Sequence, residues 1–103
     1  MMSILHTVNK SPFTSSTLNS CLKVCTKNDG ILLLEDGVFG AIQSTPCIQE
    51  LQSAMNNGIS VFVLGADVNA RGIEKKLTKG IQLTDYSKFV QLTLHYSCVQ
   101  SWY

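Results

Sequence analysis

The amino-acid sequence predicts an α/β fold: a single three-layer open sheet, mostly parallel, of about five strands with helices on both faces. The first observation is the run Ile31–Leu34, which is apolar at every position. This is typical of a strand covered on both faces, because a half-exposed strand alternates apolar and polar residues. The second is Ile59–Leu64, a similar run that stops at a glycine. The third is that helix-period stripes separate these runs, as expected for parallel strands joined by right-handed crossovers. The length suits one domain over residues 1–103.

The N-terminal third predicts a strand, a loop and an amphipathic helix. Ser3–Val8 is rich in strand formers, and Asn9–Pro12 is a loop signal. Asn28–Gly30 ends the helix before the strand at Ile31. The helix is expected to begin at Ser15, Ser16 or Thr17, and its apolar stripe at i, i+3, i+4 and i+7 contains Leu18, Cys21, Leu22 and Cys25.

The middle of the chain predicts a turn and a second helix. Val38–Ile42 is expected to be a short helix or a turn, and Ser44–Pro46 is a break. The second helix places Ile48, Leu51 and Met55 on its apolar face and is closed by Asn56–Gly58.

The C-terminal part predicts a short helix over 66–72 with Gly72 as its C-terminal cap, and a short strand over 81–84. Ser97–Tyr103 is expected to be an edge strand, because its terminal aromatic pair has too much apolar area to be left in water. Asp85 or Ser87 caps a last helix, whose buried face is expected to involve Phe89, Val90, Leu92, Thr93 and Leu94.

The low charge of the chain indicates a surface partly covered by other subunits. Charged residues make up 15% of the sequence, against about 25% in soluble proteins. The net charge is +1, and no basic run extends beyond Lys75–Lys76. Strong direct binding to nucleic acid is not expected, since it needs several clustered Lys or Arg side chains.

The sequence predicts a cytoplasmic protein with free thiols. No apolar run approaches the about 20 residues of a membrane span, and the N-terminus does not resemble a signal peptide. Four cysteines are then expected as thiols rather than disulfides; they are Cys21, Cys25, Cys47 and Cys98. They form no pair of C-x-x-C motifs, so no zinc ribbon is supported, and no metal or cofactor is predicted.

Cys21 is the candidate site residue. It lies four residues before Cys25, so both are neighbours on one helix face. One interpretation is that both thiols fill the apolar stripe as small hydrophobic residues. The functional interpretation is that Cys21 holds or passes a persulfide sulfur, which requires surroundings that favour thiolate. Cys47 follows Pro46 at a helix start, and Cys98 is expected to be exposed.

Three acids follow strand ends and are expected to share one sheet edge. Glu35, Asp36 and Asp67 could form a paired-carboxylate site if an apolar setting raised one pKa. The alternative, which we favour, is that Asp36 and Asp67 accept hydrogen bonds from nearby amides while Arg71 ties down the helix that contains Asp67. No Ser/His/Asp or Cys/His grouping and no phosphate-binding loop can be assembled from the spacing.

Several segments together resemble the TusB/DsrH family, within the DsrE/F/H-like superfamily. The resemblance spans essentially the whole chain in order. Its pieces are Leu5–Thr7, Lys10–Pro12, Leu32–Val38, Val63–Leu64, Asp67, Ala70–Gly72, Asp85–Tyr86, Phe89–Val90, Leu92–Thr93 and Gln100–Trp102.

The resemblance implies a subunit of a heterohexamer that relays persulfide sulfur. The expected partners are a TusC/DsrF-like and a TusD/DsrE-like subunit, and the complex would pass sulfur to an acceptor of the TusE/DsrC type. The pathway would be intracellular sulfur oxidation or 2-thiolation of wobble uridine in tRNA. In relatives the principal sulfur-accepting cysteine belongs to the TusD/DsrE subunit, and the comparable stretch Leu64–Val68 contains no cysteine.

These expectations describe an auxiliary or non-catalytic subunit of a sulfurtransferase complex. A cysteine on the first helix is a DsrH-like feature, so Cys21 places the chain somewhat closer to DsrH than to TusB. The alternative function is a non-catalytic small-molecule or nucleotide-binding α/β module that uses the sheet edge around Glu35, Asp36 and Asp67.

Overall fold

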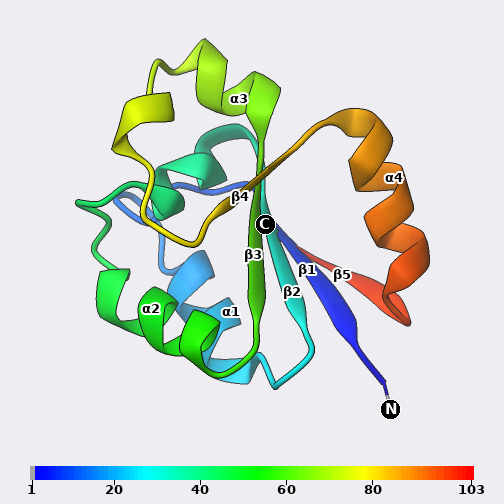
Figure 1. Cartoon of the computed structure of the whole chain (residues 1–103). Coiled ribbons are helices and arrows are strands. Elements are labelled where there is room, and N and C mark those ends of the chain that lie inside the picture. The colour runs from blue at the N-terminus through cyan, green and yellow to red at the C-terminus, as the bar shows by residue number, and fades with distance from the viewer. Residues whose placement is uncertain (1) are drawn as a thin grey trace.

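A parallel sheet forms the centre of the computed structural model, which describes residues 2–103 (Figure 1). Within those residues the sheet has five strands in the order β4-β3-β2-β1-β5, and each neighbouring pair is parallel. Helices α1 and α2 cover one face and α4 covers the other, so the predicted three-layer α/β fold is confirmed. The strands are β1 (Ile4–Val8), β2 (Gly30–Leu33), β3 (Ser60–Leu64), β4 (Gln82–Thr84) and β5 (Cys98–Trp102). The helices are α1 (Thr17–Val24), α2 (Ile48–Asn56), α3 (Gly65–Ala70) and α4 (Tyr86–His95), with the 3-10 helices η1 (Glu35–Ala41) and η2 (Glu74–Lys76).

Strand β2 is the central strand, as its unbroken apolar run predicts. All of its residues are buried. It pairs with β1 on one side, where His6 is opposite Ile31, and with β3 on the other, where Ile31 is opposite Val61. Strand β5 pairs with β1 at the end of the sheet, which confirms the predicted edge strand.

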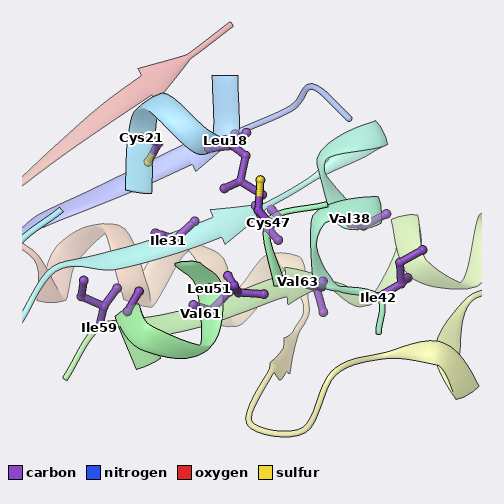
Figure 2. Packing of buried hydrophobic residues seen from close by; sticks show 14 of the residues in the cluster. Leu18, Cys21, Ile31, Val38, Ile42, Cys47, Leu51, Ile59, Val61 and Val63 are labelled. Atoms are coloured by element: carbon purple, nitrogen blue, oxygen red, sulfur yellow. The ribbon is translucent and has the colours of Figure 1, made fainter. Parts of the chain in front are cut away.

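The main hydrophobic core lies between the sheet and helices α1 and α2. Alternate residues of a strand point to opposite faces, so Ile31, Val61 and Val63 face the same helices. Figure 2 shows these side chains packed with Leu51 of α2 and Leu18 of α1. Helix α1 therefore buries the apolar stripe that the sequence predicts. Cys21 belongs to the core, and Cys25, the residue after α1, packs against it.

Two helix caps lie where the sequence predicts them, one at the start of α4 and one after the end of α3. The Asp85 carboxylate caps α4 by accepting a hydrogen bond from the backbone N–H of Lys88 at 2.8 Å. Gly72 has φ +63° and follows α3, and its N–H donates to the Asn69 carbonyl while the Ile73 N–H donates to the Val68 carbonyl. This is the Schellman arrangement, which places glycine in the left-handed conformation.

Helix α4 differs from expectation, because none of its residues is fully buried. Phe89, Leu92 and Thr93 are half-buried, whereas Val90 is 58% exposed and Leu94 is 81% exposed. Within residues 2–103, α4 is the one helix that covers this face of the sheet (Figure 1). With no second helix packed beside it, part of its apolar surface stays in contact with solvent.

Gly37 allows η1 to pass against the end of β1. The Leu34 N–H donates to the Val8 carbonyl, and η1 begins at the next residue. A Cβ atom on Gly37 would collide with that same Val8 carbonyl. Gly37→Ala is therefore expected to lower the free energy of unfolding by about 1–3 kcal/mol, the usual cost of overpacking.

Urea unfolding followed by circular dichroism measures this effect. Gly65→Ala is the matched control, because the nearest atom to its added Cβ is the Thr84 carbonyl oxygen at 3.4 Å. Equal stability of the two variants would contradict the proposed collision.

Candidate functional site

The acids at the carboxyl edge of the sheet form a structural network. Glu35 has φ +51°, and its N–H donates to the Asp67 carboxylate at 2.7 Å. Arg71 donates from Nη2 to the Asp36 carboxylate at 2.9 Å and from Nη1 to the Asp67 carbonyl at 3.2 Å. The carboxylates thus order the turn after β2 and join it to α3, which supports the structural interpretation rather than a paired-carboxylate site.

Two thiols lie together at the end of α1, as the spacing predicts. The Cys21 and Cys25 sulfur atoms are 3.8 Å apart. Cys21 is fully buried on the core side, where Figure 2 places it, whereas Cys25 is half-buried as the C-terminal cap residue of α1. The pair therefore has one sulfur inside the protein and one at its surface.

His6 completes this site from the neighbouring strand. One ring nitrogen of His6 and the Sγ atoms of Cys21 and Cys25 lie within 4.8 Å of one another. The His6 side chain is 3% exposed, and its Nε2 lies 3.0 Å from an oxygen of the equally buried Asp29 carboxylate. The indole N–H of Trp102 donates to Nδ1 at 3.0 Å. Since indole nitrogen only donates, the neutral His6 ring has its proton on Nε2 and donates it to Asp29.

Asp29 fixes this arrangement from the loop before β2. One carboxylate oxygen accepts the backbone N–H of Ile4 at 3.0 Å, and the other accepts that of Thr26 at 3.1 Å. Burial alone would raise the pKa of Asp29, but the hydrogen bonds from Thr26, His6 and Ile4 outweigh it, so the pKa is lowered. A buried carboxylate therefore orients the imidazole beside the thiol pair.

The environment of Cys25 favours the thiolate. The Cys21 thiol can donate a hydrogen bond to the Cys25 sulfur, and this contact lowers the pKa of Cys25 to about 6. Burial opposes the shift and His6 adds to it. The same contact, together with burial, raises the pKa of Cys21. This contact therefore favours the thiolate on Cys25 and the protonated thiol on Cys21.

Burial also opposes a positive charge on His6, but its hydrogen bonds to Cys25 and Asp29 raise its pKa overall. The Trp102 N–H resists protonation of Nδ1, because the hydrogen bond requires a free lone pair on that nitrogen. Protonation of the imidazole on both nitrogens therefore requires the indole to move.

Cys25 opens onto a groove between α1 and α2 with a volume of about 760 Å³. Leu22, Lys27, Glu50, Ser53 and Asn57 also line this groove. The groove gives a second molecule access to the Cys25 sulfur. A partly exposed cysteine whose pKa is lowered is typical of a reactive thiol.

The remaining sulfur atoms lie elsewhere. Cys47 is buried at the start of α2, where burial and then the charge of Glu50 raise its pKa. Cys98 is exposed on β5, as expected, and the four cysteines are free thiols. His95 lies at the exposed end of α4 against the Tyr96 ring.

Sequence reasoning selected Cys21 but did not combine it with His6, Asp29 or Trp102. The available signal was strand order: Leu5 of β1 pairs with Gly30 of β2, which places Asp29 beside the start of β1. Val8, at the end of β1, pairs with Trp102 of β5, which brings the C-terminal indole within hydrogen-bond distance of His6. Neither pairing can be read from local periodicity.

The fold and the site define a small α/β protein with a thiol pair beside a groove. The model of the family described as DsrH like protein matches residues 10–99. The chain is 37% identical over 99 residues to Protein TusB of Yersinia pestis (strain Pestoides F), which covers 96% of this chain and 100% of that protein. Protein TusB of Yersinia pseudotuberculosis serotype O:1b (strain IP 31758) gives the same values. The chain therefore belongs to the TusB/DsrH family.

Solved structures with the same fold support the architecture. The ychN protein from E. coli matches with a TM-score of 0.85, covering 98% of this chain and 99% of that chain at 19% identity. The MTH1491 protein from Methanobacterium thermoautotrophicum matches with a TM-score of 0.81 over 98% and 99% of the two chains at 9% identity. At these identities the likeness concerns the fold alone. Among residues 2–103, no helix is both long and apolar enough to cross a membrane.

Proposed function

We propose that this protein is a subunit of a cytoplasmic persulfide relay that assembles with two related subunits as a heterohexamer. The observation that carries the proposal is the Cys21–Cys25 pair beside an open groove in a chain of the TusB/DsrH family. The expected partners are the TusC/DsrF-like and TusD/DsrE-like subunits, with a TusE/DsrC-type protein as the downstream acceptor. The relay serves tRNA wobble-uridine 2-thiolation or intracellular sulfur oxidation.

Sulfur transfer at the pair needs no oxidant. The Cys25 thiolate attacks the outer sulfur of a donor persulfide. The S–S bond of the donor breaks, and the donor leaves as a thiolate. Cys25 then holds the persulfide at the groove. The Cys21 thiol can attack that outer sulfur in turn and pass its proton to the departing Cys25 sulfur, which moves the outer sulfur to Cys21 and leaves Cys25 as a thiol. Cys21 is thus an auxiliary carrier behind the surface sulfur.

The surface supports assembly with other subunits. Leu83 on β4 and Tyr86, Val90 and Leu94 on α4 are each more than half exposed. Apolar side chains gathered around one helix are typical of a protein interface. The stretch Leu64–Val68 has no cysteine, which supports an auxiliary role beside a partner that supplies the principal sulfur-accepting cysteine.

Persulfide loading of the reconstituted complex tests the proposal. The three subunits are mixed with a persulfide donor, and peptides are searched by mass spectrometry for one added sulfur atom on Cys25 and Cys21. Cys25→Ser is expected to abolish loading of this subunit, whereas Cys21→Ser keeps assembly intact and weakens sulfur handling. Cys98→Ser is the matched control, because that thiol is exposed and distant in sequence from the pair.

Two results would contradict parts of the proposal. If added sulfur never appears on Cys21 or Cys25 in an intact complex, the carrier role fails and the scaffold role remains. If the chain does not copurify with the two related subunits, the proposed heterohexamer is wrong.

The choice between the two pathways can be made from the genome. A neighbouring gene for a dissimilatory sulfite reductase would favour sulfur oxidation over tRNA thiolation.

A further inference from the structure

The groups around the thiol pair have the composition of a metal site. His6, Cys21 and Cys25 place one nitrogen and two sulfur atoms within 4.8 Å of one another. Thiolate and imidazole are the ligands that Zn²⁺ prefers in proteins. The sequence alone predicts no metal site, because the histidine lies on another strand and the cysteines do not form a C-x-x-C motif. We propose that His6, Cys21 and Cys25 bind one Zn²⁺ ion as three protein ligands and leave a fourth coordination position open.

The sulfur separation fits tetrahedral zinc. With Zn–S bonds of about 2.3 Å and a tetrahedral angle, two bound sulfur atoms lie roughly 3.8 Å apart. The Cys21 and Cys25 sulfur atoms are 3.8 Å apart. Both sulfur ligands therefore have the required spacing without a change in the helix backbone.

The imidazole needs a small movement to complete the site. A nitrogen and a sulfur bound to the same tetrahedral zinc lie roughly 3.5 Å apart. In this structure the His6 nitrogen and the two sulfur atoms lie within 4.8 Å of one another, so the nitrogen and a sulfur must move closer. A shift on the order of 1 Å at one side chain closes this gap. Cys25 is half-buried, so its side chain can make this movement. It also lines the groove, through which a zinc ion can reach the site.

Asp29 provides the usual support for a metal-bound histidine. Zinc-binding histidines commonly donate their second ring N–H to a carboxylate, which fixes the ring and strengthens it as a ligand. His6 Nε2 is 3.0 Å from the Asp29 carboxylate, so its lone pair lies on Nδ1. Two thiolates neutralise the charge of Zn²⁺, which suits a site whose Cys21 and His6 side chains are buried.

Trp102 already uses the Nδ1 lone pair that zinc would need on His6. Its indole N–H donates to Nδ1, so coordination by that lone pair must break this hydrogen bond and displace the indole. Trp102 is the one tryptophan of the sequence. Its fluorescence therefore reports the displacement without interference from another indole.

Zinc binding and sulfur transfer compete at this site, because both use the Cys21 and Cys25 sulfur atoms. The zinc site does not depend on the proposed relay, and its test uses the reduced full chain with no sulfur donor or partner. Failure of persulfide loading would leave the zinc result unchanged, and absence of zinc binding would leave the relay unchanged.

Titration of the reduced chain with Zn²⁺ against a chromophoric chelator tests the inference. We expect one ion per chain with a Kd below about 1 μM, as for a site of several protein ligands. Trp102 emission should change in parallel with occupancy, and Co²⁺ in place of Zn²⁺ should give thiolate-to-metal charge-transfer absorption. Cys25→Ser and Cys21→Ser should each weaken binding by at least about 100-fold, more than loss of a supporting residue.

Cys98→Ser is the control for non-specific thiol binding and should bind Zn²⁺ as the wild type does. His6→Gln should weaken binding and abolish the change in Trp102 emission, with circular dichroism used to verify the fold. Because Cys25 is half-exposed, Cys25→Ser keeps the test informative if the His6 variant unfolds. Unchanged affinity in the folded Cys25→Ser variant, or no stoichiometric Zn²⁺ binding by the wild type, would overturn the inference.

Discussion

Replacing Asp29 with alanine is expected to lower the free energy of unfolding by about 3–5 kcal/mol, because several buried donors lose their acceptor at about 1–3 kcal/mol each. The carboxylate accepts hydrogen bonds from the backbone N–H groups of Ile4 and Thr26 and contacts His6 Nε2. Alanine leaves these donors without an acceptor in a region where Asp29 is only 3% exposed. A buried donor that loses its partner bears its full desolvation penalty. Urea unfolding at pH 7 measures the loss.

Asp85→Ala is the matched control for the Asp29 variant. Its carboxylate also accepts a backbone N–H, but at the exposed start of α4, so we expect a loss of about 1 kcal/mol. Asp29→Asn keeps one acceptor oxygen and should fall between the two. Equal losses at positions 29 and 85 would show that the buried network contributes no more than a helix cap.

The contribution of Asp29 has a defined pH dependence. Its pKa in the folded protein is lowered from the ordinary value of 3.8. A carboxyl with a lowered folded pKa stabilises the protein fully above its unfolded pKa and loses that effect as the pH falls through the folded value. The contribution of the Asp29 carboxylate to the difference between wild type and Asp29→Ala should therefore shrink below about pH 4.

Replacing Cys21 with alanine is expected to raise the midpoint of the pH profile for Cys25 alkylation. In the wild type the Cys21 thiol lowers the pKa of Cys25 to about 6, so the alkylation rate should rise through that pH and level off above it. Alanine removes the hydrogen-bond donor, and the midpoint should move toward about 8.5, the value of a free cysteine. Iodoacetamide labelling with a metal chelator present, followed by mass spectrometry of the Cys25 peptide, gives the profile.

The alkylation experiment uses the Cys98→Ser background so that the exposed thiol does not compete for the reagent. Cys47→Ala is the matched control, because it also removes a buried thiol but one outside the pair. Its Cys25 midpoint should remain near the wild-type value. A midpoint that does not change in Cys21→Ala would mean that Cys21 fills the core without acting on Cys25.

Local patterns in the sequence determined most of the secondary structure. The unbroken apolar run predicted β2 because a strand buried on both faces needs no polar residues. The i, i+4 spacing placed Cys21 and Cys25 on one helix face because an α-helix has 3.6 residues per turn. Asp85 and Gly72 were predicted as caps because the chemistry of helix ends depends on a few adjacent residues.

The tertiary structure alone decided how much of α4 is buried. Its apolar residues Val90 and Leu94 resemble a buried stripe in sequence, yet both are exposed. Periodicity states which residues share a helix face, but it does not state what covers that face. The proposed subunits supply a physical reason for such a surface, since an interface is apolar before its partner binds.

The composition of the candidate site likewise required the tertiary structure. The central strand and the paired cysteines could be predicted because each follows from spacing within one element, and the fold class because it follows from the order of the elements. Strand order and register then brought Asp29 before β2 and Trp102 of β5 to His6 of β1, beside the two thiols. These contacts join residues up to 96 positions apart. They depend on long-range strand pairing and packing, which local side-chain periodicity does not specify.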